Sequence, residues 1–140
     1  MTLKFEALCP QGICPGWSLI VKGETSSSEN DFEINFISET GDQIAFHFNP
    51  RFPEGTIVCN SFLSSQWGQE ERTDTFPMEA KEPFLVEIYS DHDYFQVFVD
   101  DNKIMQYRHR TKQLSGITKV QILNDINISS IELTRREVYE

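Results

Sequence analysis

The sequence predicts an all-β fold in which two antiparallel sheets pack face to face as a sandwich. Apolar and polar residues alternate through many short runs, and this period of two is typical of strands with one buried face. The runs recur at roughly 8–12-residue spacing and are separated by turn residues, which is the pattern of an antiparallel sandwich. Eleven Phe, four Tyr and two Trp among 140 residues also favour strands. No run shows a convincing helical period.

Five strands are expected in the first part of the chain. A short edge strand ends before Pro10 and Pro15, because proline cannot donate to a sheet ladder. In the runs that follow, every second residue is apolar, so one face of each strand can be buried. Turn residues at 25–31 (TSSSEND) and at Gly41-Asp42 separate these runs. The predicted strands are 3–8, 17–23, 31–38, 43–49 and 56–62.

The second part of the chain repeats the pattern. A short strand is expected around Glu70 and Arg72, which are spaced by two. Turns are expected at His92-Asp93 and Asp101-Asn102. The length and the absence of a linker predict a single domain over residues 1–140. The remaining predicted strands are 84–90, 94–100, 103–107, 117–123 and 129–134.

The charge of the chain excludes several classes of partner. Acidic residues outnumber basic ones by 22 to 12, and the formal net charge is −10. Such a chain is repelled by the phosphates of nucleic acids and by anionic membrane surfaces. No apolar run approaches the ~20 residues that span a bilayer, and the amino-terminal apolar segment is too short for a signal peptide. We therefore expect a cytoplasmic protein with no nucleic-acid partner and no membrane insertion.

The cysteines do not predict a metal centre. Cys9, Cys14 and Cys59 are an odd number without the spacing of a metal site. Reduced thiols are expected in the cytosol, and no His/Cys cluster fits zinc. We expect neither a metal nor a cofactor.

A row of polar side chains stands out between residues 44 and 72. His47, Asn49 and Arg51 are spaced by two, so a strand would point all three to one face, while Phe46 and Phe48 point to the other. An imidazole, an amide and a guanidinium in one row offer the donors and acceptors that suit neighbouring hydroxyl groups.

Further polar groups are expected on the neighbouring strands. Asn60 could add a second amide, and Glu70 and Arg72 should project together. An unbroken strand would turn Trp67 to the opposite face from Glu70, but Gly68 makes a turn or bulge easy there. A sugar ring has hydroxyls at its edge and C–H groups on its faces, so an indole beside fixed polar groups predicts a sugar site.

A catalytic reading of Glu70 and Glu71 as a glycosidase pair is disfavoured. Adjacent strand residues face opposite sides, so the two carboxylates cannot share a site. The nearby arginines would favour the charged form of Glu70, whereas a general acid needs its pKa raised. We expect no enzyme and no catalytic residue.

At these residues the sequence resembles the galectins, the family of β-galactoside-binding lectins. The family signature H-x-N-P-R, V-x-N and W-G-x-E-x-R stands here at residues 47–51, 58–60 and 67–72. The resemblance covers the whole chain and implies a jelly-roll β-sandwich that forms one carbohydrate-recognition domain. The loop at 51–58 is shorter than in many galectins. All seven sugar-binding positions match: His47, Asn49, Arg51, Asn60, Trp67, Glu70 and Arg72.

The resemblance implies how the first part of the signature would hold galactose. Trp67 would stack on the apolar face of the ring. His47, Asn49 and Arg51 would bind its axial 4-hydroxyl.

The remaining signature residues would extend this contact. Asn60 and Glu70 would hold the 6-hydroxyl of galactose. Arg72, together with Glu70, would reach the neighbouring glucose or N-acetylglucosamine of lactose or N-acetyllactosamine.

Within the family, the chain is most similar to a branch from the eye lens. The similarity is carried by residues 14–23, 32–36, 49–52, 82–91 and 117–125. Two functions therefore remain open. One is a lectin that binds β-galactosides, and the other is a structural, crystallin-like, soluble lens protein whose sugar site is secondary or vestigial.

The resemblance also implies an assembly. Galectins of this type form noncovalent homodimers through terminal strands, which correspond here to residues 7–12 and 129–139. It further implies that secretion by an unconventional route is possible.

Overall fold

A computed structural model describes residues 1–135 of the chain. These residues form twelve β-strands and one 3-10 turn, Leu114–Gly116, and contain no helix long and apolar enough to cross a membrane. The strands are β1 (Leu3–Leu8), β2 (Trp17–Glu24), β3 (Phe32–Ser38), β4 (Ile44–Arg51), β5 (Thr56–Leu63), β6 (Gln66–Trp67), β7 (Glu71–Thr73), β8 (Phe84–Ser90), β9 (Tyr94–Val99), β10 (Asn102–Arg108), β11 (Ile117–Asn124) and β12 (Asn127–Arg135).

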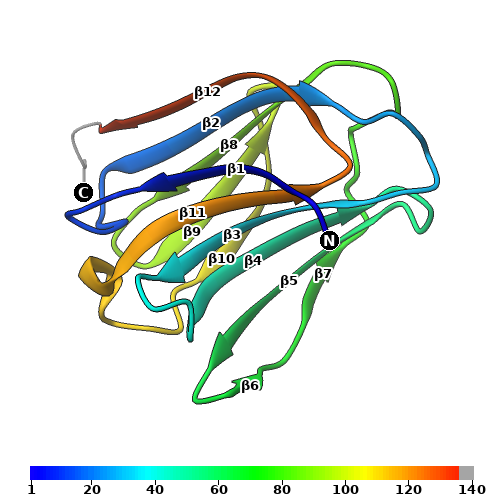
Figure 1. Ribbon diagram of the computed structural model, residues 1–140. Coiled ribbons are helices and arrows are strands. Elements are labelled where there is room, and N and C mark those ends of the chain that lie inside the picture. The colour runs from blue at the N-terminus through cyan, green and yellow to red at the C-terminus, as the bar shows by residue number, and fades with distance from the viewer. Residues whose placement is uncertain (136–140) are drawn as a thin grey trace.

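The strands form two antiparallel sheets that face each other (Figure 1). The first sheet has the order β1-β11-β3-β4-β5-β6, and β7 also pairs with β5. The second sheet has the order β10-β9-β8-β2-β12. Strands from the two ends of the chain pair with each other, β1 with β11 and β2 with β12. The predicted all-β jelly-roll sandwich is confirmed.

The core lies between the sheets and consists mainly of Phe, Ile and Val side chains. The rings of Phe36 on β3, Phe46 on β4 and Phe95 on β9 stack, with centroids 5.4 Å apart for Phe36–Phe95 and 4.9 Å apart for Phe46–Phe95. These rings join the two sheets. Because side chains alternate along β4, the burial of Phe46 and Phe48 turns His47 to the outer face of the first sheet.

The register of the first sheet brings polar residues of three strands into one row. Asn35 on β3 lies opposite His47 on β4, and His47 lies opposite Asn60 on β5. Asn60 thus lies beside the row on β4, as the sequence predicted, and Asn35 extends the row to β3.

Pro50 lies inside β4 rather than in the loop that was expected to follow Asn49. It pairs in register with Ile57 on β5. On the other side, Ile34 pairs with Phe48, so the same register places Phe32 opposite Pro50. Proline has no N–H to donate, and the Asn49 side-chain Nδ2 donates to the Phe32 carbonyl instead, at 2.8 Å. The amide thus replaces a missing ladder bond.

Candidate functional site

The outer face of the first sheet carries a hollow of about 360 Å³ beside β4, β5 and β6. Five of the seven predicted site residues line it. Asn49 and Arg72 do not line it: Asn49 is buried and bonded to Arg51, and Arg72 is bonded to Glu70. The complete lining is His47, Arg51, Val58, Asn60, Trp67, Gly68 and Glu70.

His47 presents a hydrogen-bond acceptor to this hollow. Burial, and secondly the nearby Arg51 guanidinium, lowers the pKa of the imidazole from 6.5 to about 4, so the ring is neutral near pH 7. Its Nδ1 lies 2.7 Å from Asn35 Oδ1 and 3.3 Å from Glu33 Oε1. Because both neighbours are acceptors, the single N–H of the neutral ring sits on Nδ1, and Nε2 keeps a free lone pair.

The contact between His47 and Glu33 is not an ion pair. Burial raises the pKa of the Glu33 carboxyl, the opposite of the effect that a charged partner would have. The pKa of His47 is lowered, which also disfavours the charged form. The two pKa shifts are those expected when a neutral imidazole and a buried carboxyl group share a hydrogen bond.

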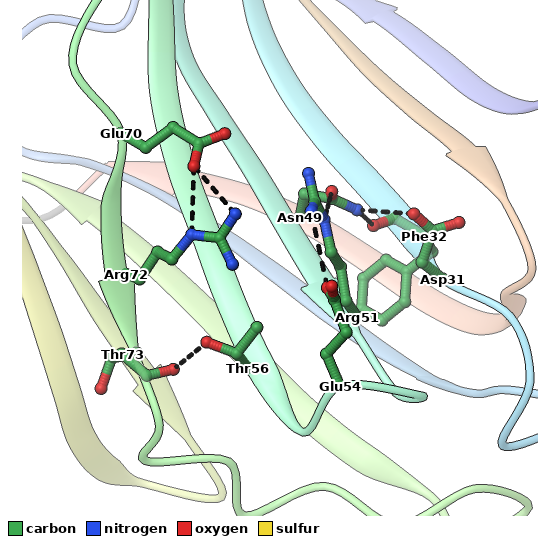
Figure 2. Close-up of polar contacts among 9 residues, drawn as sticks. All are labelled: Asp31, Phe32, Asn49, Arg51, Glu54, Thr56, Glu70, Arg72 and Thr73. Carbon is green, nitrogen blue, oxygen red and sulfur yellow. Dashed lines mark hydrogen bonds and ion pairs between the residues drawn. The ribbon is translucent and has the colours of Figure 1, made fainter.

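Asn49 holds Arg51 in place (Figure 2). Both Nδ2 protons of Asn49 are used by the protein, one by Asp31 Oδ2 at 3.1 Å and one by the Phe32 carbonyl at 2.8 Å. Its Oδ1 accepts from Arg51 Nε at 2.8 Å, and Arg51 Nη1 lies 3.5 Å from Glu54 Oε2. Arg51 is therefore oriented on two sides, and its remaining N–H groups are free to donate at the hollow.

Trp67 stands at the rim, with 49% of its surface exposed. Its ring centroid lies 5.1 Å from that of His47 and 5.3 Å from that of Phe62. The strand ends directly after Trp67, and β7 begins only at Glu71. The predicted interruption at Gly68 is thus present, and it allows both Trp67 and Glu70 to line the same hollow.

Glu70 and Glu71 point to different partners. Glu70 Oε1 accepts from Arg72 Nε at 3.0 Å and from Arg72 Nη2 at 2.9 Å (Figure 2). Glu71 Oε2 instead accepts from Arg110 Nη2 at 2.9 Å. The two carboxylates do not converge on one point, which removes the geometry that a glycosidase pair requires.

Sequence reasoning missed Arg110. This residue follows β10, and its guanidinium reaches Asn60 Oδ1 at 2.9 Å, the Gln69 carbonyl at 2.5 Å and Glu71. The basic run at 108–112 (RHRTK), unusual in a chain of charge −10, is the one signal that could have pointed to it.

The assembled groups can form hydrogen bonds in several directions beside one flat aromatic surface. Charged donors and acceptors strengthen such bonds. Among the described residues, no group of three or more His, Cys, Asp or Glu side chains could hold a metal ion. The chemistry that this arrangement offers is the recognition of a small polyhydroxylated molecule.

Comparison with known proteins agrees with this chemistry. The family described as galactoside-binding lectin matches residues 4–133. Grifin from Rattus norvegicus is 44% identical over 136 residues, which cover 97% of this chain and 94% of that protein. Grifin from Homo sapiens is 40% identical over the same shares of the two chains. Galectin-3 from Canis lupus familiaris is 38% identical over 133 residues, which cover 93% of this chain and 44% of that protein.

Solved structures show the same fold. Sheep galectin-11, in complex with glycerol, superposes with a TM-score of 0.84 at 22% identity, covering 96% of this chain and 99% of its own. The galectin LEC-6 of Caenorhabditis elegans superposes with a TM-score of 0.83 at 25% identity, covering 96% and 94%. The family match over residues 4–133 and the identity of 40–44% to the Grifins place the chain in the galectin family of galactoside-binding lectins.

Proposed function

We propose that this galectin binds β-galactosides, with lactose and N-acetyllactosamine as its minimal ligands, through one carbohydrate-recognition domain over residues 1–140. The observation that carries the proposal is the hollow beside Trp67, where polar groups are already oriented by protein partners. Specificity arises because a hydroxyl of the wrong configuration leaves such buried groups unpaired.

The axial 4-hydroxyl of galactose would be held between His47 and Arg51. His47 Nε2 accepts the hydroxyl proton, and a guanidinium N–H of Arg51 donates to the oxygen. Asn49 acts mainly by orienting Arg51, because both of its own N–H groups are occupied by Asp31 and Phe32. An equatorial hydroxyl, as in glucose, would not reach this pair.

The 6-hydroxyl would lie between Asn60 and Glu70, with the sugar face stacked on Trp67. One Asn60 Nδ2 proton is used by the Gly68 carbonyl at 2.9 Å, so the other serves as a donor. Glu70 supplies the acceptor. Arg72, aligned by its two bonds to Glu70, reaches the second sugar.

Calorimetric titration of the purified chain with lactose tests this proposal. We expect saturable binding that is lost in Arg72→Ala and in Trp67→Ala. Arg108→Ala is a matched control, because Arg108 contacts Tyr94 outside the hollow. Cellobiose, which carries an equatorial 4-hydroxyl, should not bind. A flat lactose titration of well-folded protein would contradict the proposal.

A second candidate function is that of an abundant, structural, crystallin-like lens protein. It is favoured by the higher identity to the Grifins, 44% for the rat protein, than to canine galectin-3, 38%. The net charge of −10 would keep such a protein soluble at high concentration. Quantitative proteomics of lens fibres tests it, because scarce and widespread expression would count against it.

A cytoplasmic location, possible unconventional secretion and a noncovalent homodimer complete the proposal. The segments expected at the dimer interface are residues 7–12 and 129–139, of which 136–139 lie outside the described residues. Both β1 and β12 are edge strands, which leaves their outer backbone groups available for pairing. Sedimentation over a range of concentrations should show a mass that doubles.

A further inference from the structure

We propose that Arg110 is a positioning residue that holds Asn60 and the segment 67–71 in the geometry needed for sugar binding. This inference rests on the proposed lectin function. Arg110 does not line the hollow, so its effect would pass through the groups it bonds.

The first of these groups is the Asn60 side chain. Its Oδ1 accepts from Arg110 Nη1 at 2.9 Å and from the Ser61 backbone N–H at 2.8 Å. Its Nδ2 donates to the Gly68 carbonyl at 2.9 Å. Three of the four hydrogen bonds that an amide can make are thus internal, and the fourth, an N–H, remains for a ligand. Arg110 therefore helps to fix the orientation of the amide, together with the Ser61 N–H and the Gly68 carbonyl.

The second group is the backbone between β6 and β7. Gln69 and Glu70 belong to no strand, and therefore lack ladder bonds. Arg110 Nη2 donates to the Gln69 carbonyl at 2.5 Å and to Glu71 Oε2 at 2.9 Å. These bonds fix the residues on both sides of Glu70 in the segment between β6 and β7.

Gly68 provides the space that Arg110 needs. A Cβ at this position would lie 2.7 Å from Arg110 Nη1 and 3.3 Å from Asn60 Oδ1. The Gly68 backbone is not among the left-handed positions of the described residues, so an added Cβ would act by displacing the end of the Arg110 side chain rather than by straining the backbone. The glycine of the signature Trp67-Gly68 pair therefore leaves room for Arg110, which lies 42 positions after Gly68 in the chain.

The guanidinium is anchored on the second sheet. It stacks over the Tyr107 ring, with its central carbon 4.7 Å from the ring centroid. Tyr107 on β10 is fully buried, and its hydroxyl lies 2.6 Å from Ser61 Oγ on β5. Ser61 Oγ also donates to the Ala45 carbonyl at 2.8 Å. Arg110 thus connects Tyr107 on the second sheet to Asn60 on the binding face of the first sheet.

Lysine could not replace this function. Three acceptors, on Asn60, Gln69 and Glu71, lie around one planar fork, and a flat surface is needed to stack on Tyr107. An ammonium group keeps the charge but lacks the fork and the stacking plane.

Lactose titrations of the full chain with Arg110→Lys test the inference, and Arg108→Lys is the matched control. Arg108 also stacks on a tyrosine, 4.8 Å from the Tyr94 centroid, but makes no contact with the site. We expect Arg110→Lys to weaken lactose binding roughly tenfold, and Arg108→Lys to leave it unchanged. Gly68→Ala, which displaces Nη1, should reproduce the loss.

A double-mutant cycle separates positioning from general destabilisation. In an Asn60→Ala background, Arg110→Lys should weaken binding clearly less than tenfold, because the part of its effect that passes through Asn60 is already lost, while the part that passes through Gln69 and Glu71 remains. An undiminished tenfold loss in that background, or unchanged binding in Arg110→Lys, would overturn the inference.

A readout without sugar keeps the inference distinct from the proposed function. With Trp17→Phe, Trp67 is the single tryptophan. Arg110→Lys should then increase acrylamide quenching of Trp67 fluorescence, while Arg108→Lys should not. If the wild type fails to bind lactose, the lectin proposal is wrong. Independently of that result, equal quenching in Arg110→Lys and Arg108→Lys would overturn the positioning role of Arg110.

Discussion

The His47 ring donates its Nδ1 proton to Asn35 Oδ1, 2.7 Å away on the neighbouring strand. This bond, and a pKa lowered to about 4, leave the imidazole neutral with Nε2 as an acceptor. The chemistry of His47 is therefore set by β3 as well as by its own strand.

Lactose binding should be constant between pH 8 and pH 5. An ordinary histidine would become protonated near pH 6.5, whereas His47 takes up a proton only near pH 4. Protonation would turn Nε2 from an acceptor into a donor and would weaken binding. Titrations across this range measure it, and a midpoint near pH 6.5 would contradict the assigned state of His47.

The stability of the protein should fall as the pH drops from about 6.5 to about 4, in part because of His47. The folded-state pKa is lower than the unfolded one, so the unfolded chain binds the proton first and gains population. The full effect is about 2–4 kcal/mol.

Chemical denaturation of wild type and His47→Gln at pH 7 and pH 4.5 measures this contribution. His109, whose pKa is also lowered by burial, acts with the same sign, and Glu33, whose pKa is raised by burial, acts with the opposite sign. His109 is unchanged in the variant, whereas Glu33 lies 3.3 Å from the His47 ring, so the difference reports on His47 together with this contact. An identical loss of stability in the variant would refute the assignment.

Asn49→Asp should destabilise the fold by about 1–3 kcal/mol, as well as weaken sugar binding. A carboxylate cannot donate to the Phe32 carbonyl, and it would face the Asp31 carboxylate. Urea unfolding measures the loss. Asn127→Asp, at an exposed position of β12, adds the same charge and should change stability by less than about 0.5 kcal/mol.

Tyr107→Phe should reduce stability by about 1–2 kcal/mol, because it removes a buried hydrogen bond to Ser61. The ring that stacks under Arg110 is retained, so lactose affinity should change less than about twofold. Tyr94→Phe, which loses an exposed bond from Arg108, is the control. Equal losses in the two variants would show that the buried hydroxyl has no special weight.

The strand pattern of this protein was predictable because its apolar alternation is nearly unbroken. Phe46 and Phe48 must be buried, and this alone turns His47 outward. The lectin family, and with it the conclusion that the chain is not an enzyme, also followed from local motifs and is confirmed by the family match.

The features that could not be predicted from the sequence depend on contacts between segments that are far apart in the chain. Arg110 lies 50 residues from Asn60, and no periodicity connects them. The sequence suggested Asn49 as a sugar contact. Its bond to the Phe32 carbonyl could not be predicted, because it depends on how β3 and β4 pair beside Pro50. The roles of the seven signature residues in sugar binding remain predictions that the titrations address.

The exposed indole of Trp67 has a thermodynamic consequence. Nearly half of this side chain faces water in the free protein, beside polar groups that already have protein partners. A stacked sugar would remove that apolar surface from water without reordering the site. Association should therefore carry a negative heat-capacity change, and its enthalpy should become more favourable as the temperature rises.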